Sequence, residues 1–212
     1  MDINQIMEQK RKDAQPDQLY KITKCWNCPN AVVDITRAEA ELERYFRDTR
    51  FSEKQRERLA GAEPKHHDIF HVAIAGCPNS CCQPQIKDFS LQAQAVPEVG
   101  EGCTGCGLCM EACPDQAIVL NEKGPVINRL LCLNCGICAK NCPSETIRVG
   151  LRGYRVIRGG KLGRRPRLAQ EICSLSKENG VLLLLEETVD LLHREGKPGE
   201  RLGALLERLR RV

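Results

Sequence analysis

The sequence lacks several features that would indicate common classes of protein. Its 212 residues contain no run of about 20 apolar residues, so no membrane-spanning helix is expected. Aromatic residues make up only 4% and the net charge is +4, which leaves few rings and little positive charge for binding nucleic acid. Residues 1–15 have no apolar core of the kind found in signal peptides, so we expect a soluble cytoplasmic protein.

Cysteine, by contrast, is abundant, with 14 residues in the chain. They form four groups and one single residue: Cys25 and Cys28; Cys77, Cys81 and Cys82; four between 103 and 113; four between 132 and 142; and Cys173. In a reducing compartment such a density indicates metal binding rather than disulfide bonds. The grouping supports this interpretation, because cysteines that bind one metal centre must lie close together.

One cysteine motif occurs twice in the middle of the chain. Each copy reads Cys-x2-Cys-x2-Cys-x3-Cys-Pro, and the copies begin at Cys103 and Cys132. In bacterial ferredoxins with this spacing, three cysteines of a run bind one [4Fe–4S] cluster and the fourth binds the other. The spacing therefore predicts two ligand sets: Cys103, Cys106, Cys109 and Cys142 for cluster one, and Cys132, Cys135, Cys138 and Cys113 for cluster two. Zinc is the alternative, but it takes four sulfurs around one metal rather than a repeated three-plus-one run.

The segments on either side of this block have the pattern of an α/β domain. Capping-box patterns at Thr36 and Ser52 each predict the start of a helix. The expected elements are helices over 2–15, 37–48 and 181–195, a short helix after Ser52, a last helix after Pro198, and strands over 69–75, 88–96 and 154–157. Cys173 is expected in a helical stretch as a buried thiol. The cysteine-rich block interrupts this domain, which divides the chain into 1–96, 97–149 and 150–212.

Three segments carry a resemblance to a known family. The stretch from His71 to Gln85 resembles the Cys-x3-Cys signature of siroheme-dependent sulfite and nitrite reductases. The segment from Cys28 to Asp34 and residues 153–169 resemble other parts of that family, whose dissimilatory and anaerobic members carry a ferredoxin inserted after Cys-x3-Cys. The resemblance covers roughly residues 20–212. It implies an α+β fold, in which one sulfite-reductase-like α/β half-domain carries an inserted ferredoxin-type module of βαβ repeats with two clusters.

By this resemblance, a third [4Fe–4S] cluster is expected on Cys28, Cys77, Cys81 and a fourth cysteine. The family spaces its first pair as Cys-x5-Cys, which would place the first cysteine at position 22, where this chain has isoleucine. Cys25 is the expected substitute, and Cys82 is the alternative fourth ligand. A structural zinc site or buried thiols would be other uses of the same residues.

The resemblance also implies siroheme, the iron tetrapyrrole of these enzymes, with Cys81 bridging to its iron. The basic loop would then pair with the siroheme carboxylates through Lys161, Arg164, Arg165 and Arg167. The alternative is that this loop is a solvated or partner-facing surface. Enzymes of this family consist of two related halves with siroheme between them, and this chain corresponds to the second half. A second copy or another subunit would have to complete the pocket.

Three functions follow from these features. The first is an iron–sulfur electron-transfer protein that serves redox partner proteins or other subunits of a complex, because the sequence shows no acid–base pair, nucleophile or nucleotide-binding loop. The second is a half-size siroheme-dependent sulfite or nitrite reductase, completed by a dimer or another subunit. The third is a redox sensor or structural metal protein. Oxygen sensitivity and an anaerobic setting are expected.

Overall fold

The computed structural model describes residues 18–26 and 28–209, so the helix expected over 2–15 lies outside the described residues. A five-stranded mixed sheet has the order β1-β2-β3-β6-β7. Its strands are β1 (Tyr20–Lys24), β2 (Phe70–Ala75), β3 (Phe89–Val99), β6 (Ile147–Arg158) and β7 (Gln170–Ser176). The first three strands run parallel, and β6 runs antiparallel to both β3 and β7. The carboxyl ends of β1, β2 and β3 therefore point the same way.

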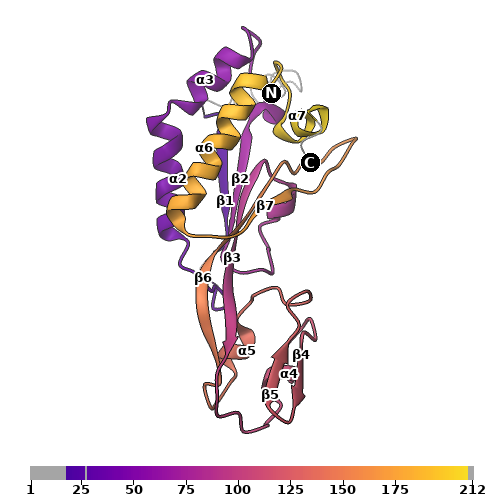
Figure 1. The fold of residues 1–212 in the computed structure, drawn as a ribbon. Helices are drawn as coiled ribbons and strands as arrows, with labels where there is room; N and C mark the ends of the chain where they lie inside the picture. Colours follow the sequence, from indigo (N-terminus) through magenta and orange to yellow (C-terminus); the bar gives the residue numbers. More distant parts are fainter. Residues whose placement is uncertain (1–17, 27, 210–212) are drawn as a thin grey trace, which may run out of the picture.

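Helices cover one face of this sheet (Figure 1). They are α2 (Thr36–Asp48), α3 (Phe51–Arg58) and α6 (Glu178–Glu195), with α7 (Leu202–Arg208) beside the end of β6. Alternate strand residues such as Val72, Ile74 and Leu91 pack against helical residues such as Leu42 and Leu185, all fully buried. The apolar side chains on one face of the strands and the apolar stripes of the helices thus produce one core on this side. No helix among the described residues is long and apolar enough to cross a membrane.

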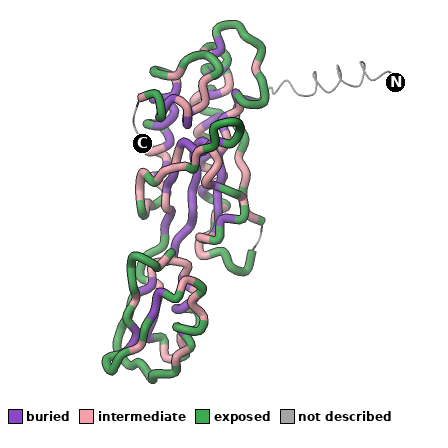
Figure 2. The backbone as a smooth tube through the Cα atoms, turned by 90° about the vertical axis from the view of Figure 1, so that its right-hand side faces the viewer, coloured by how far each residue is buried: buried purple, intermediate pink, exposed green. Residues whose placement is uncertain are grey.

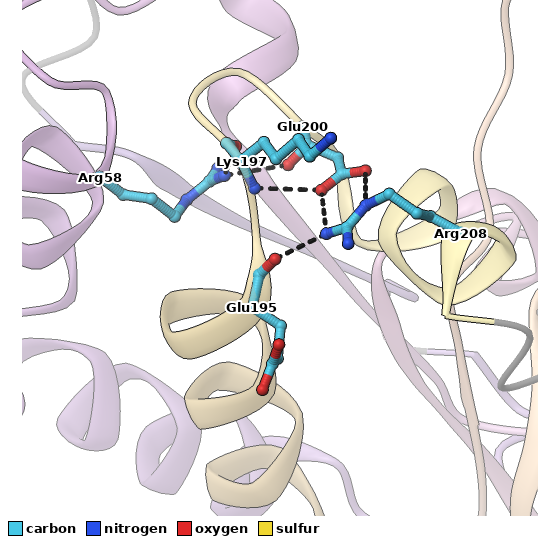
Figure 3. A network of polar contacts seen from close by, with 5 residues as sticks. All are labelled: Arg58, Glu195, Lys197, Glu200 and Arg208. Atoms are coloured by element: carbon cyan, nitrogen blue, oxygen red, sulfur yellow. Dashed lines mark hydrogen bonds and ion pairs between the residues drawn. The ribbon is translucent and has the colours of Figure 1, made fainter.

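A network of polar contacts holds the connection between α6 and α7 at one end of this domain (Figure 3). Arg208 donates hydrogen bonds to the Glu200 carboxylate at 2.9 Å and to Glu195 O at 2.6 Å. Arg58 of α3 donates to Lys197 O and Glu200 O at 2.5 and 3.1 Å. Arg208 therefore satisfies a carbonyl that the end of α6 leaves without a helical partner, and Arg58 satisfies two carbonyls of the loop that follows.

A smaller lobe hangs from the sheet on the extensions of β3 and β6 (Figures 1 and 2). The two strands continue as a ribbon past a register shift between Val96 and Pro97. The lobe contains α4 (Leu108–Glu111), β4 (Ile118–Asn121), β5 (Gly124–Ile127) and α5 (Ile137–Lys140). Its own small core consists of Cys109, Ile118, Cys138 and Ile147. Figure 2 shows that most of the lobe backbone is exposed or half-buried, unlike the buried strands of the larger part.

The expected mixed α/β architecture is confirmed, but several local expectations are wrong. Thr36 lies inside α2 rather than capping it, and its N–H donates to Asp34 Oδ1 at 3.0 Å. Ser52 also lies inside its helix, and its Oγ accepts the N–H of Leu19 at 3.0 Å. Cys173 belongs to strand β7 and is half-buried rather than helical and buried. The bond from Thr36 N–H to Asp34 is a local contact, the bond from Leu19 N–H to Ser52 is a tertiary one, and Cys173 is paired with Val156 of β6.

Candidate iron–sulfur centres

The two copies of the repeated motif adopt the same backbone conformation. Each copy ends in a one-turn helix, α4 or α5, that carries its third cysteine. Positive φ angles recur at three pairs of equivalent positions: Gly105 and Asn134, Gly107 and Gly136, Gln116 and Glu145. Glycine and asparagine adopt this conformation at low cost, which explains their presence at the first two pairs. The repeat in sequence is therefore also a repeat in the path of the chain.

The eight cysteines of the repeat border two separate hollows. One hollow is lined by Cys103, Cys106, Cys109 and Cys142. The other is lined by Cys113, Cys132, Cys135 and Cys138. In each hollow, the fourth cysteine comes from the other copy of the motif. In the described part of the chain, no three His, Cys, Asp or Glu side chains converge on a point suited to a single metal ion.

Backbone amides donate hydrogen bonds to four of these sulfurs, the first and the fourth of each copy. The N–H groups of Gly105 and Asn134 each lie 3.4 Å from the sulfur two residues earlier. The N–H groups of Ala117 and Ile147 lie 3.3 and 3.4 Å from Cys113 Sγ and Cys142 Sγ. Amide donors of this kind stabilise negative charge on thiolates and around a cluster. The donor set therefore fits a [4Fe–4S] group in each hollow.

The remaining cysteine groups meet at the carboxyl ends of β1 and β2. Cys25 directly follows β1, and its N–H donates to Ile74 O at 3.1 Å. The loop after Cys28 returns to the same place, since Val32 N–H donates to Gly76 O at 2.8 Å. A Cβ at Gly76 would lie 3.2 Å from the Ala31 Cβ, so glycine permits this close approach. Cys77 follows immediately, as the sequence predicts for a group placed on a loop after a strand.

Polar contacts shape the loop from Cys77 to Cys82. Ser80 has φ 59° and is buried, and its Oγ donates to Pro78 O at 2.9 Å. Asn79 Nδ2 lies 3.1 Å from Cys81 Sγ, the sulfur predicted to bridge to siroheme. Burial, and next the nearby Cys25, raises the pKa of the Cys82 thiol to about 12. Both candidates for the fourth ligand therefore lie side by side, and the choice between them stays open.

The basic loop divides into two inward and two outward residues. Lys161 is buried and its Nζ donates to Glu207 Oε2 of α7 at 2.8 Å. Arg167 Nη1 donates to Gly203 O, also in α7, at 3.0 Å. Arg164 and Arg165 are exposed. The sequence pattern alone could not separate these pairs, because their partners lie about 40 residues away in the chain.

Sequence reasoning missed a set of buried polar residues on β3. Ser90, Gln92 and Gln94 are at most 8% exposed, although each is polar. They alternate with Leu91 and Ala93 of the core. The alternation was visible in the sequence, but only the structure shows that cysteine loops cover the polar face.

Comparison with known proteins agrees with this arrangement. Residues 21–209 match the nitrite and sulphite reductase 4Fe-4S domain. The chain belongs to this family. The structure is similar to the crystal structure of dissimilatory sulfite reductase I, with a TM-score of 0.61 and 17% identity, covering 89% of this chain and 49% of that one. The structure of Mycobacterium tuberculosis NirA protein matches more weakly, with a TM-score of 0.44 and 16% identity over 88% of this chain and 25% of that one.

One curated relative is more similar in sequence to the present chain than these two structures are. The coenzyme F420-dependent sulfite reductase of Methanocaldococcus jannaschii is 42% identical over 139 residues. The match covers 65% of this chain and 20% of the relative, so the chain spans only a small part of that protein. The family and this relative support an iron–sulfur redox role. They leave the number of clusters to be tested by experiment.

Proposed function

We propose that this chain is an electron-transfer protein that holds three [4Fe–4S] clusters and passes single electrons within a redox complex. One observation carries the proposal. The four cysteines that line each hollow of the small lobe include the fourth cysteine of the other motif copy. This exchange matches the pattern of two-cluster ferredoxins. Clusters in these hollows would supply one-electron carriers, while the amides of residues 105, 117, 134 and 147 would stabilise their charge.

We also propose that residues 97–149 form an inserted ferredoxin module between family segments 1–96 and 150–212. The lobe has its own small core, separate from the core between helices and sheet. It leaves the domain through β3 and returns through β6, which are paired along their whole length. An insertion at one continuous hairpin leaves the order of the other strands unchanged. This arrangement supports an inserted module, because without it a short turn could join β3 to β6.

The third cluster is proposed on Cys25, Cys28, Cys77 and Cys81. The support is that the loops after β1 and β2 are hydrogen-bonded to each other at one edge of the sheet. By the resemblance described above, Cys28, Cys77 and Cys81 would occupy the positions of the family's cluster ligands. The fourth is Cys25 or its neighbour Cys82, and the two are separated by the substitutions described below.

Iron and sulfide analysis of anaerobically purified protein tests this proposal. We expect about 12 irons per chain, from three four-iron clusters. Cys106→Ala removes a proposed ligand of cluster one and should lower the iron content, while the equivalent Cys135→Ala should do the same for cluster two. Electron paramagnetic resonance of the reduced protein should show the corresponding signals lost. Zinc in place of iron, or no change on either substitution, would contradict the proposal.

A second candidate is a siroheme-dependent sulfite or nitrite reductase, assembled from this chain and a second copy or another subunit. The sulfite reductase activity named for the M. jannaschii relative favours it, although the chain matches only 20% of that protein. Arg164 and Arg165 are the exposed basic residues available for siroheme carboxylates. Expression in a host that makes siroheme, followed by an absorption spectrum, tests this candidate. A spectrum without siroheme bands would remove it and leave the electron-transfer proposal intact.

A further inference from the structure

The face of β3 that points away from the helices is polar and buried. Ser90, Gln92 and Gln94 occupy alternate positions on it and are 0, 5 and 8% exposed. Burying an amide or hydroxyl group is costly unless it forms hydrogen bonds, so such residues usually have specific partners. Here the partners belong to two different cysteine loops.

The upper part of this face holds the loop from Cys77 to Cys82, where the third cluster is proposed. Gln92 Nε2 donates to Ser80 Oγ at 2.6 Å, and Ser80 lies between Cys77 and Cys81. Ser90 Oγ donates to Pro84 O at 2.9 Å, just after the same loop. Arg155 of β6 donates to Gln92 Oε1 at 3.3 Å and so orients the amide. The loop is therefore attached to the sheet through side chains rather than through strand pairing.

The lower part of this face holds the second copy of the ferredoxin motif. Asn134 Nδ2 donates to Gln94 Oε1 at 3.2 Å, and Ala95 N–H donates to Asn134 O at 2.7 Å. Cys135 forms an isolated parallel bridge with Ala95. A Cβ at Gly136 would lie only 3.0 Å from the Ala95 Cβ, so glycine is needed for this approach. The Cys132–Cys135 segment therefore packs directly on β3.

The first copy of the motif lies elsewhere in the lobe. Its hollow is lined by Leu120 of β4 and Pro125 of β5, whereas the hollow of the second copy is lined by Pro97 of β3. Gln92 and Gln94, which hold the two inner loops, are two residues apart on one face of a strand, a spacing of roughly 7 Å. The hollow of cluster two (Cys113, Cys132, Cys135 and Cys138) is thus the inner one, next to the Cys77 loop, and the hollow of cluster one is the outer one.

We propose that Gln92 and Gln94 are positioning residues that hold the Cys132 loop next to the Cys77 loop. They make cluster two (Cys113, Cys132, Cys135 and Cys138), and not cluster one, the direct electron donor to the third cluster. One electron leaves the inner ferredoxin site and reduces the third site, with no bond broken and no proton moved. The electron comes from a low-potential one-electron reductant, either a reduced iron–sulfur protein or, in the laboratory, dithionite. This inference rests on the proposed function, because it requires clusters at all three cysteine groups.

The test uses the anaerobically purified holoprotein and four single variants. Gln92→Leu and Gln94→Leu remove the amides, and Asn134→Gly removes the partner of Gln94 while giving this position the residue found at Gly105. Gln55→Leu is the matched control, because Gln55 is likewise buried, at 2% exposed, and donates a hydrogen bond to Asp68 O in the helical part of the domain. Each protein is analysed for iron, for magnetic interaction between reduced clusters by electron paramagnetic resonance, and for the rate of dithionite reduction by freeze-quench sampling.

We expect all four variants to keep the wild-type iron content. Gln92→Leu, Gln94→Leu and Asn134→Gly should weaken the interaction between the second and third clusters and slow reduction of the third several-fold, whereas Gln55→Leu should do neither. Combining Gln94→Leu with Asn134→Gly should add little to either single change, because both remove the same hydrogen bond. Equal behaviour of the glutamine variants and the Gln55→Leu control would overturn the proposal.

The order of the sites is tested separately by removing one ferredoxin cluster at a time. The magnetic interaction seen at the third cluster should persist in Cys106→Ala and disappear in Cys135→Ala. The opposite result would assign cluster one as the donor and reject the inference. A wild-type content of about eight irons would instead mean that the third cluster, and with it the proposed function, is wrong.

Discussion

Cys25 N–H donates a hydrogen bond to Ile74 O at 3.1 Å, one residue past the end of the parallel pairing of β1 and β2. This contact continues the strand register and leads the chain after β1 to the loop that begins at Cys77. Parallel strands end at the same edge of a sheet, so two cysteine pairs far apart in sequence meet there. The contact also places Cys25 beside Cys82, and the choice between the two can be tested.

Cys25→Ala should lower the iron content from about 12 to about 8 per chain, because a four-iron cluster is lost with one of its ligands. Cys82→Ala serves as the matched control and should keep about 12 irons. Iron analysis of the anaerobically purified proteins measures both. The reverse outcome would assign Cys82 as the fourth ligand of the third cluster.

The basic loop should show two kinds of response to substitution. Lys161→Ala should lower the midpoint of urea unfolding, because the buried lysine stem packs near Gly203 and its ammonium pairs with Glu207. Lys161→Met keeps most of the stem and should lose less stability. Arg165→Ala should leave the midpoint unchanged, since Arg165 is exposed. If Lys161→Ala unfolded at the wild-type urea concentration, the packing role assigned to this lysine would be wrong.

Gly160 should not tolerate a larger residue. A Cβ there would lie 2.4 Å from Gln85 O and 2.8 Å from the Lys87 nitrogen, both backbone atoms that cannot turn away. We expect Gly160→Ala to destabilise the protein by about 1–3 kcal/mol, the usual cost of forcing extra volume into a packed site. Gly100→Ala is the control, because its nearest contact would be an ordinary 3.5 Å to Thr146 O. Chemical denaturation measures the difference, and equal stability of the two variants would refute this account.

Acid should destabilise the fold partly through His193. Burial, together with Arg58 and Lys54, lowers the pKa of His193 to about 4, whereas an unfolded histidine has a pKa of about 6.5. The unfolded state therefore binds more protons between these values, so the stabilising contribution is complete above pH 6.5 and is lost as the pH falls toward 4. His193→Gln should show a shallower loss of unfolding midpoint between pH 7 and pH 5 than the wild type. Parallel pH profiles would show that His193 does not contribute.

The local chemistry of the small lobe was predictable from the sequence. The spacing Cys-x2-Cys-x2-Cys-x3-Cys-Pro predicted which four cysteines belong together, and the structure places those same sets around two hollows. The hydrophobic periodicity likewise predicted β2 and β3 and helices α2 and α6 to within a few residues. These features depend on short stretches of chain, where spacing and periodicity act directly. The ligand roles of the cysteines themselves stay a prediction until iron is measured.

Other features depended on residues distant in sequence. The capping pattern at Ser52 failed because its Oγ accepts the N–H of Leu19, a residue 33 positions away in the chain. The pattern at Thr36 failed for a local reason, because Thr36 lies inside α2 and its N–H donates to Asp34 Oδ1. Strands β1 and β7 were missed because edge strands of this sheet are short or half-buried and lack clear alternation. No local pattern predicts that Lys161 and Arg167 point inward, because the groups that they bind belong to α7.

By itself, the sequence determined the family, the repeated cysteine motif and the grouping of its cysteines, because identity and spacing are properties of the chain alone. Only the tertiary structure decided which cysteine group is inner and which is outer. That order follows from the register of β3, which places Gln92 against Ser80 and Gln94 against Asn134. A shift of one residue would have turned both glutamines into the apolar core. Long-range strand pairing therefore decides the proposed electron route, although the cysteine spacing predicts the sites that it connects.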